Sequence, residues 1–189
     1  PYSIKSGEYN IVDLAKNLIT KSLSGDFPSK IESLNIDLKF EDLMSLKKER
    51  SNALNRGMLR DSRYYPAKLY YEESNHNARL RLKGDLNDHW KFDNRWSFRI
   101  NLKDDSSFLG FERFSLQRPS ARQFPYEPLF QAWIREAGNL SPRNNFARLN
   151  FNGDDWGIMY FEEQVSTALV EHQKKKESVI FEFNSEDHW

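Results

Sequence analysis

Two stretches in which apolar and polar residues alternate strictly, separated by a polar loop, form the clearest pattern in the chain. The apolar positions are Ala78, Leu80 and Leu82 in the first stretch and Trp96, Phe98, Ile100 and Leu102 in the second. A period of two places all apolar side chains of a stretch on one face, which is typical of half-buried strands. We therefore predict two antiparallel strands, over 78–83 and 95–103, that are joined by the polar loop 85–94.

The opposite face of the same two stretches is basic. Its residues are Arg79, Arg81, Lys83, Arg95, Arg99 and Lys103. Gly84 ends the first stretch, and the backbone N–H groups of a glycine turn, like guanidinium groups, match the oxygens of a phosphate. The pattern therefore indicates a phosphate-binding face, and it equally fits a hairpin whose basic side is only solvated.

The remaining periodicities predict helices and further strands. Helices are expected over 10–23, 41–56, 125–137 and 165–172, and strands over 34–40, 66–73, 112–117, 146–151, 156–162 and 179–183. Asn152-Gly153 lies between two of these strands and is a strong hairpin signal, because both residue types accept a positive φ. From residue 66 the order is four strands, a helix and two strands. This order predicts an α+β fold in which one helix packs on an antiparallel sheet.

Composition narrows the possible functions. The chain of 189 residues carries 28 basic and 28 acidic residues, so no global field favours nucleic acid or an anionic membrane. It contains no cysteine, which excludes disulfides, thiolate metal sites and a cysteine nucleophile. The four histidines lack metal-ligand spacing, and no apolar run is long enough to span a bilayer. The chain begins at Pro1, which we interpret as a trimmed start from which a signal or anchor could have been removed.

Other charged residues are weaker candidates for a binding or catalytic site. Arg118 and Arg122 fall in the connection between a strand and a helix, where ligands are often bound, and surface arginines are the equally good alternative. Glu127 opens the helix, where a carboxylate suits the helix dipole and could also accompany a phosphate-binding cation. The adjacent pair Glu162 and Glu163 does not fit a glycosidase dyad, because neighbouring residues of a strand point to opposite faces.

Several segments together resemble the spore coat protein H (CotH) kinase family. They are Arg81-Leu82-Lys83-Gly84-Asp85 with His89-Trp90, Arg95 to Ile100, Phe114 to Gln117 with Pro119 and Arg122, Asn152-Gly153 with Gly157-Ile158, and Glu162-Glu163-Gln164. The resemblance implies that 62–189 forms the small lobe of a protein-kinase-like fold. A helix–strand–helix extension over 1–61 would precede this lobe.

The resemblance also assigns roles to single residues. Lys83, Gly84 and Arg95, with Arg122, would hold the phosphates of ATP, and Glu127 would orient a cation. Adenine would meet backbone groups of a hinge at 163–165, which includes Glu163 and Gln164. Family members carry a catalytic aspartate and a magnesium motif in a large lobe, and nothing in this chain matches either, so we expect this chain alone to be inactive.

The expected function of the whole protein is transfer of phosphate from ATP, with magnesium or manganese, to a protein of the cell envelope or a coat layer. The missing large lobe would be a second partner, and we expect neither ATP nor a metal ion on this chain alone. The competing hypothesis is a non-catalytic structural or adaptor module that keeps the kinase-like scaffold. A third, carbohydrate binding, would use Trp90 or Trp156 as an exposed aromatic surface.

Overall fold

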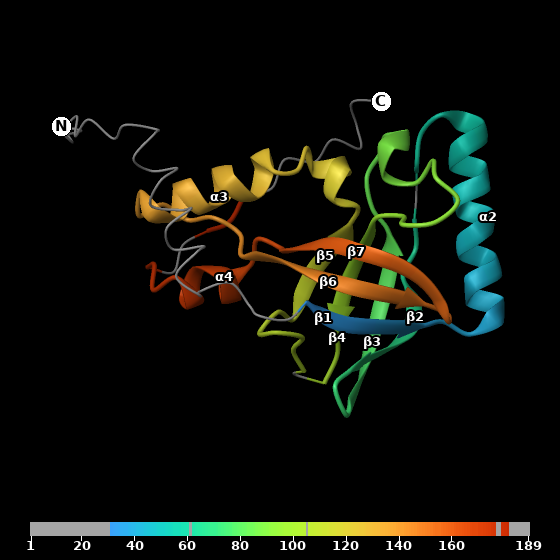
Figure 1. The fold of residues 1–189 in the computed structure, drawn as a ribbon, viewed down its shortest axis with the longest axis horizontal. Helices are drawn as coiled ribbons and strands as arrows, with labels where there is room; N and C mark the ends of the chain where they lie inside the picture. The colour runs from blue at the N-terminus through green and yellow to red at the C-terminus, as the bar shows by residue number, and fades with distance from the viewer. Residues whose placement is uncertain (1–30, 61, 105, 177–178, 182–189) are drawn as a thin grey trace. The chain divides into compact units, whose positions relative to one another are not determined.

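Seven strands close into a barrel in the computed structural model, which describes residues 31–60, 62–104, 106–176 and 179–181 (Figure 1). The strands are β1 (Glu32–Asp37), β2 (Tyr65–Tyr71), β3 (Ser74–Leu82), β4 (Phe98–Leu102), β5 (Arg113–Gln117), β6 (Asn144–Phe151) and β7 (Asp154–Glu163). Around the barrel they follow the order β1-β2-β3-β4-β5-β7-β6, so that β1 and β6 meet and no edge remains open.

Within the described residues, three α-helices and two short 3₁₀ turns lie outside the barrel. They are α2 (Phe40–Arg56), α3 (Tyr126–Glu136) and α4 (Thr167–His172), with η1 (Asn87–His89) and η2 (Pro119–Arg122). Figure 1 shows α2 on one side of the strands and α3 and α4 on the other. Among the described residues, no helix is long and apolar enough to cross a membrane.

The expected fold, an open sheet with a packed helix resembling a kinase small lobe after a separate extension, is wrong. The strand β1, which we placed in that extension, pairs antiparallel with β2 and parallel with β6, from Glu32 opposite Ala147 to Ile36 opposite Phe151. This parallel pairing closes the barrel. Alternation in a sequence reveals a strand and its buried face but does not reveal its neighbours, so the closure left no signal in the pattern.

The local elements agree more closely with the patterns. The helix expected over 41–56 is α2, and Gly57 ends it with a φ of 77°. Asn152 and Gly153 turn between β6 and β7 with φ values of 49° and 86°. The strand expected over 95–103 begins only at Phe98, and residues 179–181 of the expected last strand are not in a strand. The expected helix over 10–23 lies outside the described residues.

The barrel interior is filled by aromatic and aliphatic side chains. Phe98 stacks on Phe151 and on Trp156, with ring centroids 5.0 and 5.6 Å apart, and Phe108 lies 5.3 Å from Phe161. Aromatic pairs of this kind add about 0.5–1.5 kcal/mol each beyond the area they bury. Because most apolar residues of the strands point inward, the polar residues that alternate with them are presented on the outside.

Candidate functional site

A row of polar residues runs across the outside of four neighbouring strands. The register places Arg81 of β3 opposite Arg99 of β4, Arg99 opposite Ser115 of β5, and Ser115 opposite Glu162 of β7. A neighbouring residue of each strand points into the barrel: Leu82, Phe98, Leu116 and Phe161 are fully buried. The alternation therefore presents two arginines and a glutamate side by side on the outer face.

Lys83 continues this outer face just beyond the end of β3. Its backbone N–H donates to the carbonyl of Ser97 at 2.9 Å, and its Nζ donates to Oε1 of Gln117 at 3.2 Å. Ser97 and Gln117 are themselves completely buried. Polar side chains on the outside of a barrel are normally solvated, so their burial shows that the loops and helices above them cover this part of the face.

The covering elements contribute three more polar residues. Arg122, at the end of η2, donates from Nη2 to Oε1 of Glu127 at 2.7 Å and to Oε2 of Glu162 at 3.3 Å. Gln131 of α3 donates to the same two oxygens at 2.8 and 2.9 Å. The helix α3 is thus held to the strand β7 through polar contacts. We call the resulting group of residues the polar cluster: Lys83, Arg99, Gln117, Arg122, Glu127, Gln131 and Glu162.

Burial shapes the protonation of Lys83. The pKa of Lys83 is lowered from 10.5 to about 8, mainly by removal from water; the charges of Arg122 and Arg99 act in the same direction, and those of Glu162 and Glu127 oppose it. The amine of Lys83 therefore loses its proton only a little above neutral pH.

Charges of the polar cluster also act on its neighbours. Burial alone would lower the pKa of Arg122, but Glu162 and Glu127 outweigh it, and the net pKa is raised. Burial lowers the pKa of His89, and Lys83 and Arg122 lower it further. His89 Nδ1 lies 2.9 Å from Oγ of Ser97, beside the backbone contact of Lys83. The region around Lys83 thus disfavours an additional positive charge.

Several buried N–H groups in this region have no acceptor. Within the described residues, Nε of Arg99, Nε of Arg122 and Nε2 of Gln117 are buried without a hydrogen-bond partner. A buried donor without a partner costs about 1–3 kcal/mol, and more when the group is charged. The polar cluster therefore has buried N–H donors that lack acceptors, and a bound anion would supply those acceptors.

Of the residues predicted from the sequence, the structure brings Lys83, Arg122 and Glu127 together. The pKa of Lys83 responds to both of the others, so their charges lie within electrostatic reach. Arg95 does not join them: its Nη2 donates to the carbonyl of Ile158 at 2.6 Å, and it is not among the charges that act on Lys83.

Gly84 shapes the backbone beside Lys83. Its φ is 90°, and a Cβ built on it would overlap the ring of His89 and lie 2.8 Å from the Cβ of that residue. Its carbonyl accepts a hydrogen bond from Nε1 of Trp90 at 2.9 Å. Glycine is required here both for the positive φ and for the close approach of the His89 side chain.

Glu163 and Gln164, the predicted hinge, engage other parts of the barrel. The side chain of Glu163 forms an ion pair with Arg143 at 2.5 Å, and its backbone N–H donates to the carbonyl of Arg143. The backbone N–H of Gln164 donates to the carbonyl of Arg113 at 3.0 Å. Two of the backbone N–H groups of the hinge predicted at 163–165 are therefore already used within the barrel.

Sequence reasoning missed Gln117, Gln131 and Glu162. Gln131 lies four residues after Glu127, a spacing that puts both on one face of a helix. Glu162 and Tyr160 alternate with the buried Phe161, which could have placed them on the outer face of β7. What no pattern could supply is that α3 would lie over this strand.

Comparisons with known proteins add nothing to the site. A scan of the chain against protein-family models finds no match, and a search among curated proteins finds none either. Among the residues that the structure describes, no group of three or more His, Asp or Glu side chains is arranged to hold a metal ion.

Proposed function

We propose that the polar cluster binds the phosphate groups of ATP, and that the whole protein transfers phosphate to a protein of the cell envelope or a coat layer. The observation that supports binding is the pair of buried guanidinium Nε groups without an acceptor, on Arg99 and Arg122, beside Lys83. Cations with free donors are the groups that recognise phosphate in proteins. The transfer reaction itself rests on the resemblance to the CotH kinase family.

The residues of the cluster would act by position and charge. Arg122 is 32% exposed at its side chain, so its guanidinium can turn from Glu127 toward an incoming phosphate. Glu127, 27% exposed against 12% for Glu162, is the carboxylate that we assign to magnesium or manganese accompanying ATP. The metal ion would neutralise phosphate charge, which is its general role in phosphoryl transfer.

Calorimetric titration of the whole protein, and not of this chain alone, with ATP tests the proposal. We expect Lys83→Met to weaken binding by about 10- to 100-fold, or about 1.5–3 kcal/mol, as for hydrogen bonds to charged groups. Arg79→Met is the matched control, because Arg79 lies on the same face of β3 but stacks on Tyr64. If the two variants lose equal affinity, or if neither loses any, the basic face is only a solvated surface.

The pH dependence of ATP binding gives an independent check. A bound phosphate favours the protonated amine, so binding near pH 8 should take up a proton at Lys83. We expect affinity to fall as pH rises from 7 to 9, and the heat of binding to depend on the ionisation enthalpy of the buffer. In Lys83→Met this proton uptake should be absent.

The second candidate function is that of a non-catalytic adaptor module, and one observation favours it. On α3, Tyr126, Leu129, Phe130 and Trp133 are all exposed, at spacings that place them along one helix face. Exposed apolar stripes of this kind mark interaction surfaces. If ATP and tripolyphosphate both fail to bind the whole protein, the adaptor function is the one to pursue.

A further inference from the structure

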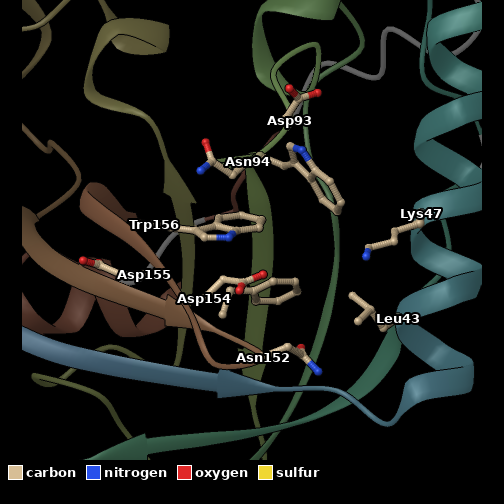
Figure 2. Close-up of a pocket in the computed structure, with 10 residues that line it drawn as sticks. Leu43, Lys47, Asp93, Asn94, Asn152, Asp154, Asp155 and Trp156 are labelled. Atoms are coloured by element: carbon tan, nitrogen blue, oxygen red, sulfur yellow. The ribbon is translucent and has the colours of Figure 1, made fainter.

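A pocket between α2 and the β6–β7 hairpin has no feature that requires a ligand. It has a volume of about 320 Å³, and Lys47 and Asp154, which line it, are both exposed to water (Figure 2). Trp156 in its wall is 5% exposed and Trp90 is fully buried, so neither is the exposed aromatic surface that carbohydrate binding would need. The polar cluster is different, because it contains buried N–H groups that lack acceptors.

The helix α3, which lies over this cluster, is attached to the barrel differently from the other two helices. In α2, Leu46 and Ala53 are buried in the apolar core, and in α4, Leu169 and Val170 are buried. In α3, all of whose residues the structure describes, Gln131 is buried and no apolar side chain is. Because helices in proteins are held mainly by the packing of an apolar face, α3 lacks the attachment that α2 and α4 have.

Gln131 instead connects α3 to the outer face of the barrel through both ends of its amide. Its Nε2 donates to Oε2 of Glu162 at 2.9 Å. Its Oε1 accepts from Nδ2 of Asn144 at 2.6 Å and from the hydroxyl of Tyr160 at 3.4 Å. Water competes for both partners of such hydrogen bonds, so each of them contributes modestly to stability. The attachment of α3 therefore depends strongly on this one side chain.

The N–H groups that we assign to phosphate are covered in the closed arrangement. Nε of Arg99, Nε of Arg122 and Nε2 of Gln117 are all buried, so a phosphate reaches them only after part of their cover moves. Arg122 is joined to that cover, because its Nη2 donates to Oε1 of Glu127 on α3 at 2.7 Å. Since α3 has no buried apolar side chain, it is the helix that moves at the lowest cost.

We propose that α3 is a movable cover over the polar cluster and that Gln131 holds this cover closed. The inference rests on the phosphate-binding function proposed above. When Gln131 releases Glu162, α3 lifts from β7 and Arg122 loses its contact with Glu127. The guanidinium of Arg122 and the amide of Gln117 are then accessible to phosphate. Phosphate therefore binds the fraction of molecules in which α3 is open, and the closed form excludes it.

Hydrogen exchange of the whole protein tests the cover without a ligand. We expect the amides of 129–137 to exchange at least about tenfold faster than those of β7, because a short helix that leaves the barrel unfolds in water. Gln131→Ala should speed exchange in α3 by about a further tenfold and leave β7 unchanged. Alanine favours helix, so this change reports detachment. Leu129→Ala, which truncates an exposed residue of the same helix, is the matched control and should stay within about twofold.

Calorimetric titration of the same proteins with tripolyphosphate, in the absence of metal ions, tests whether the cover controls the site. Gln131→Ala should bind tripolyphosphate about tenfold more tightly than the wild type, because the apparent affinity is reduced by the fraction of molecules that are closed. Leu129→Ala should bind it within about twofold of the wild type. A role of Gln131 in positioning Glu127 or Glu162 for the ligand would have the opposite effect, since its loss would weaken binding.

The two measurements separate the cover from the phosphate-binding function. Exchange in α3 that is equal in Gln131→Ala and Leu129→Ala, or that rises together with exchange in β7, overturns the cover. So does tripolyphosphate binding that is equal or weaker in Gln131→Ala, and in that case the phosphate-binding function stands. If tripolyphosphate binds neither the wild type nor Gln131→Ala, the phosphate-binding function fails, and the cover has no site to control.

Discussion

At the scale of single residues, burial changes the chemistry of side chains that look ordinary in the sequence. Lys83 is one of several lysines on a basic face, but only its position under the loops and α3 brings its pKa down to about 8. The pKa of Tyr160 shifts in the opposite direction: burial, with Glu162 and Glu127 nearby, raises the pKa of its phenol. Lys83 and Tyr160 both lie on the outer face of the barrel, and both pKa shifts arise because the loops and α3 cover that face.

The shift of Lys83 predicts a pH-dependent contribution to stability. Between pH 8 and 10.5 its amine is mostly neutral in the folded chain and protonated in the unfolded one, so the unfolded state binds more protons. The free energy of unfolding of the wild type, measured against Lys83→Met, should therefore rise over this range, by up to about 1.4 kcal/mol per pH unit. Below pH 8 the difference should be flat.

Urea denaturation at pH 7, 8, 9 and 10 measures this difference. Lys103→Met, which removes an exposed lysine just after β4, should show no such rise against the wild type. A difference between wild type and Lys83→Met that stays constant up to pH 10 would mean that Lys83 is as well solvated as Lys103.

At the scale of elements, a single side chain fastens α2 to the loop before β4. Arg50 donates from Nε to the carbonyl of Trp90 at 2.7 Å and from Nη2 to those of Lys91 and Phe92 at 3.2 and 2.6 Å. Its guanidinium also lies 4.8 Å from the ring centroid of Trp96. The loop has little regular structure, so these contacts hold it in place where a strand ladder would otherwise do so.

Arg50→Met should therefore destabilise the chain by about 2–3 kcal/mol, because it leaves carbonyls of the loop without donors and removes the cation–π contact. Denaturation in urea measures the loss, and hydrogen exchange should show it first in the amides of 87–97. Lys48→Met, an exposed position on the same helix, should stay within about 0.5 kcal/mol of the wild type. Unchanged exchange in that loop would show that other contacts hold it.

At the scale of the whole molecule, closure of the barrel makes the first described strand part of a common core. Leu34 and Ile36 of β1 are buried in the same apolar cluster as Phe98 of β4, although two strands separate them around the barrel. In an open sheet with a separate extension, β1 could unfold by itself. In a closed barrel its loss exposes the edges of β2 and β6 and the interior between them.

Leu34→Ala should consequently destabilise the entire barrel, by about 2–5 kcal/mol as for other buried leucines. Native-state hydrogen exchange tests this, since the protection of the β4 amides should fall by the same free energy as the global stability. Phe40→Ala, at an exposed residue of α2, serves as the control. If β4 keeps its full protection in Leu34→Ala, β1 behaves as an independent extension.

Part of this molecule could be predicted from short-range patterns. The alternation at 78–83 and 95–103 indicated strands and their buried faces, although the second strand begins only at Phe98. Asn152-Gly153 indicated the hairpin, and Gly57 indicated the end of α2. Within the site, Lys83, Arg122 and Glu127 were chosen from charge, position and the family resemblance, and they do lie within electrostatic reach of one another. Arg95 was chosen on the same grounds and lies instead against the carbonyl of Ile158.

The sequence by itself determined most of the described strands and helices and the side of each that faces inward, because those properties depend on neighbours a few positions away. Only the tertiary structure decided that β1 pairs with β6, that Glu162 and Gln131 join Arg122, and that Lys47 faces Trp156 across a pocket. Each of these contacts joins residues far apart in the chain. Such contacts depend on strand register and barrel closure, which the packing of the whole core selects and no local pattern encodes.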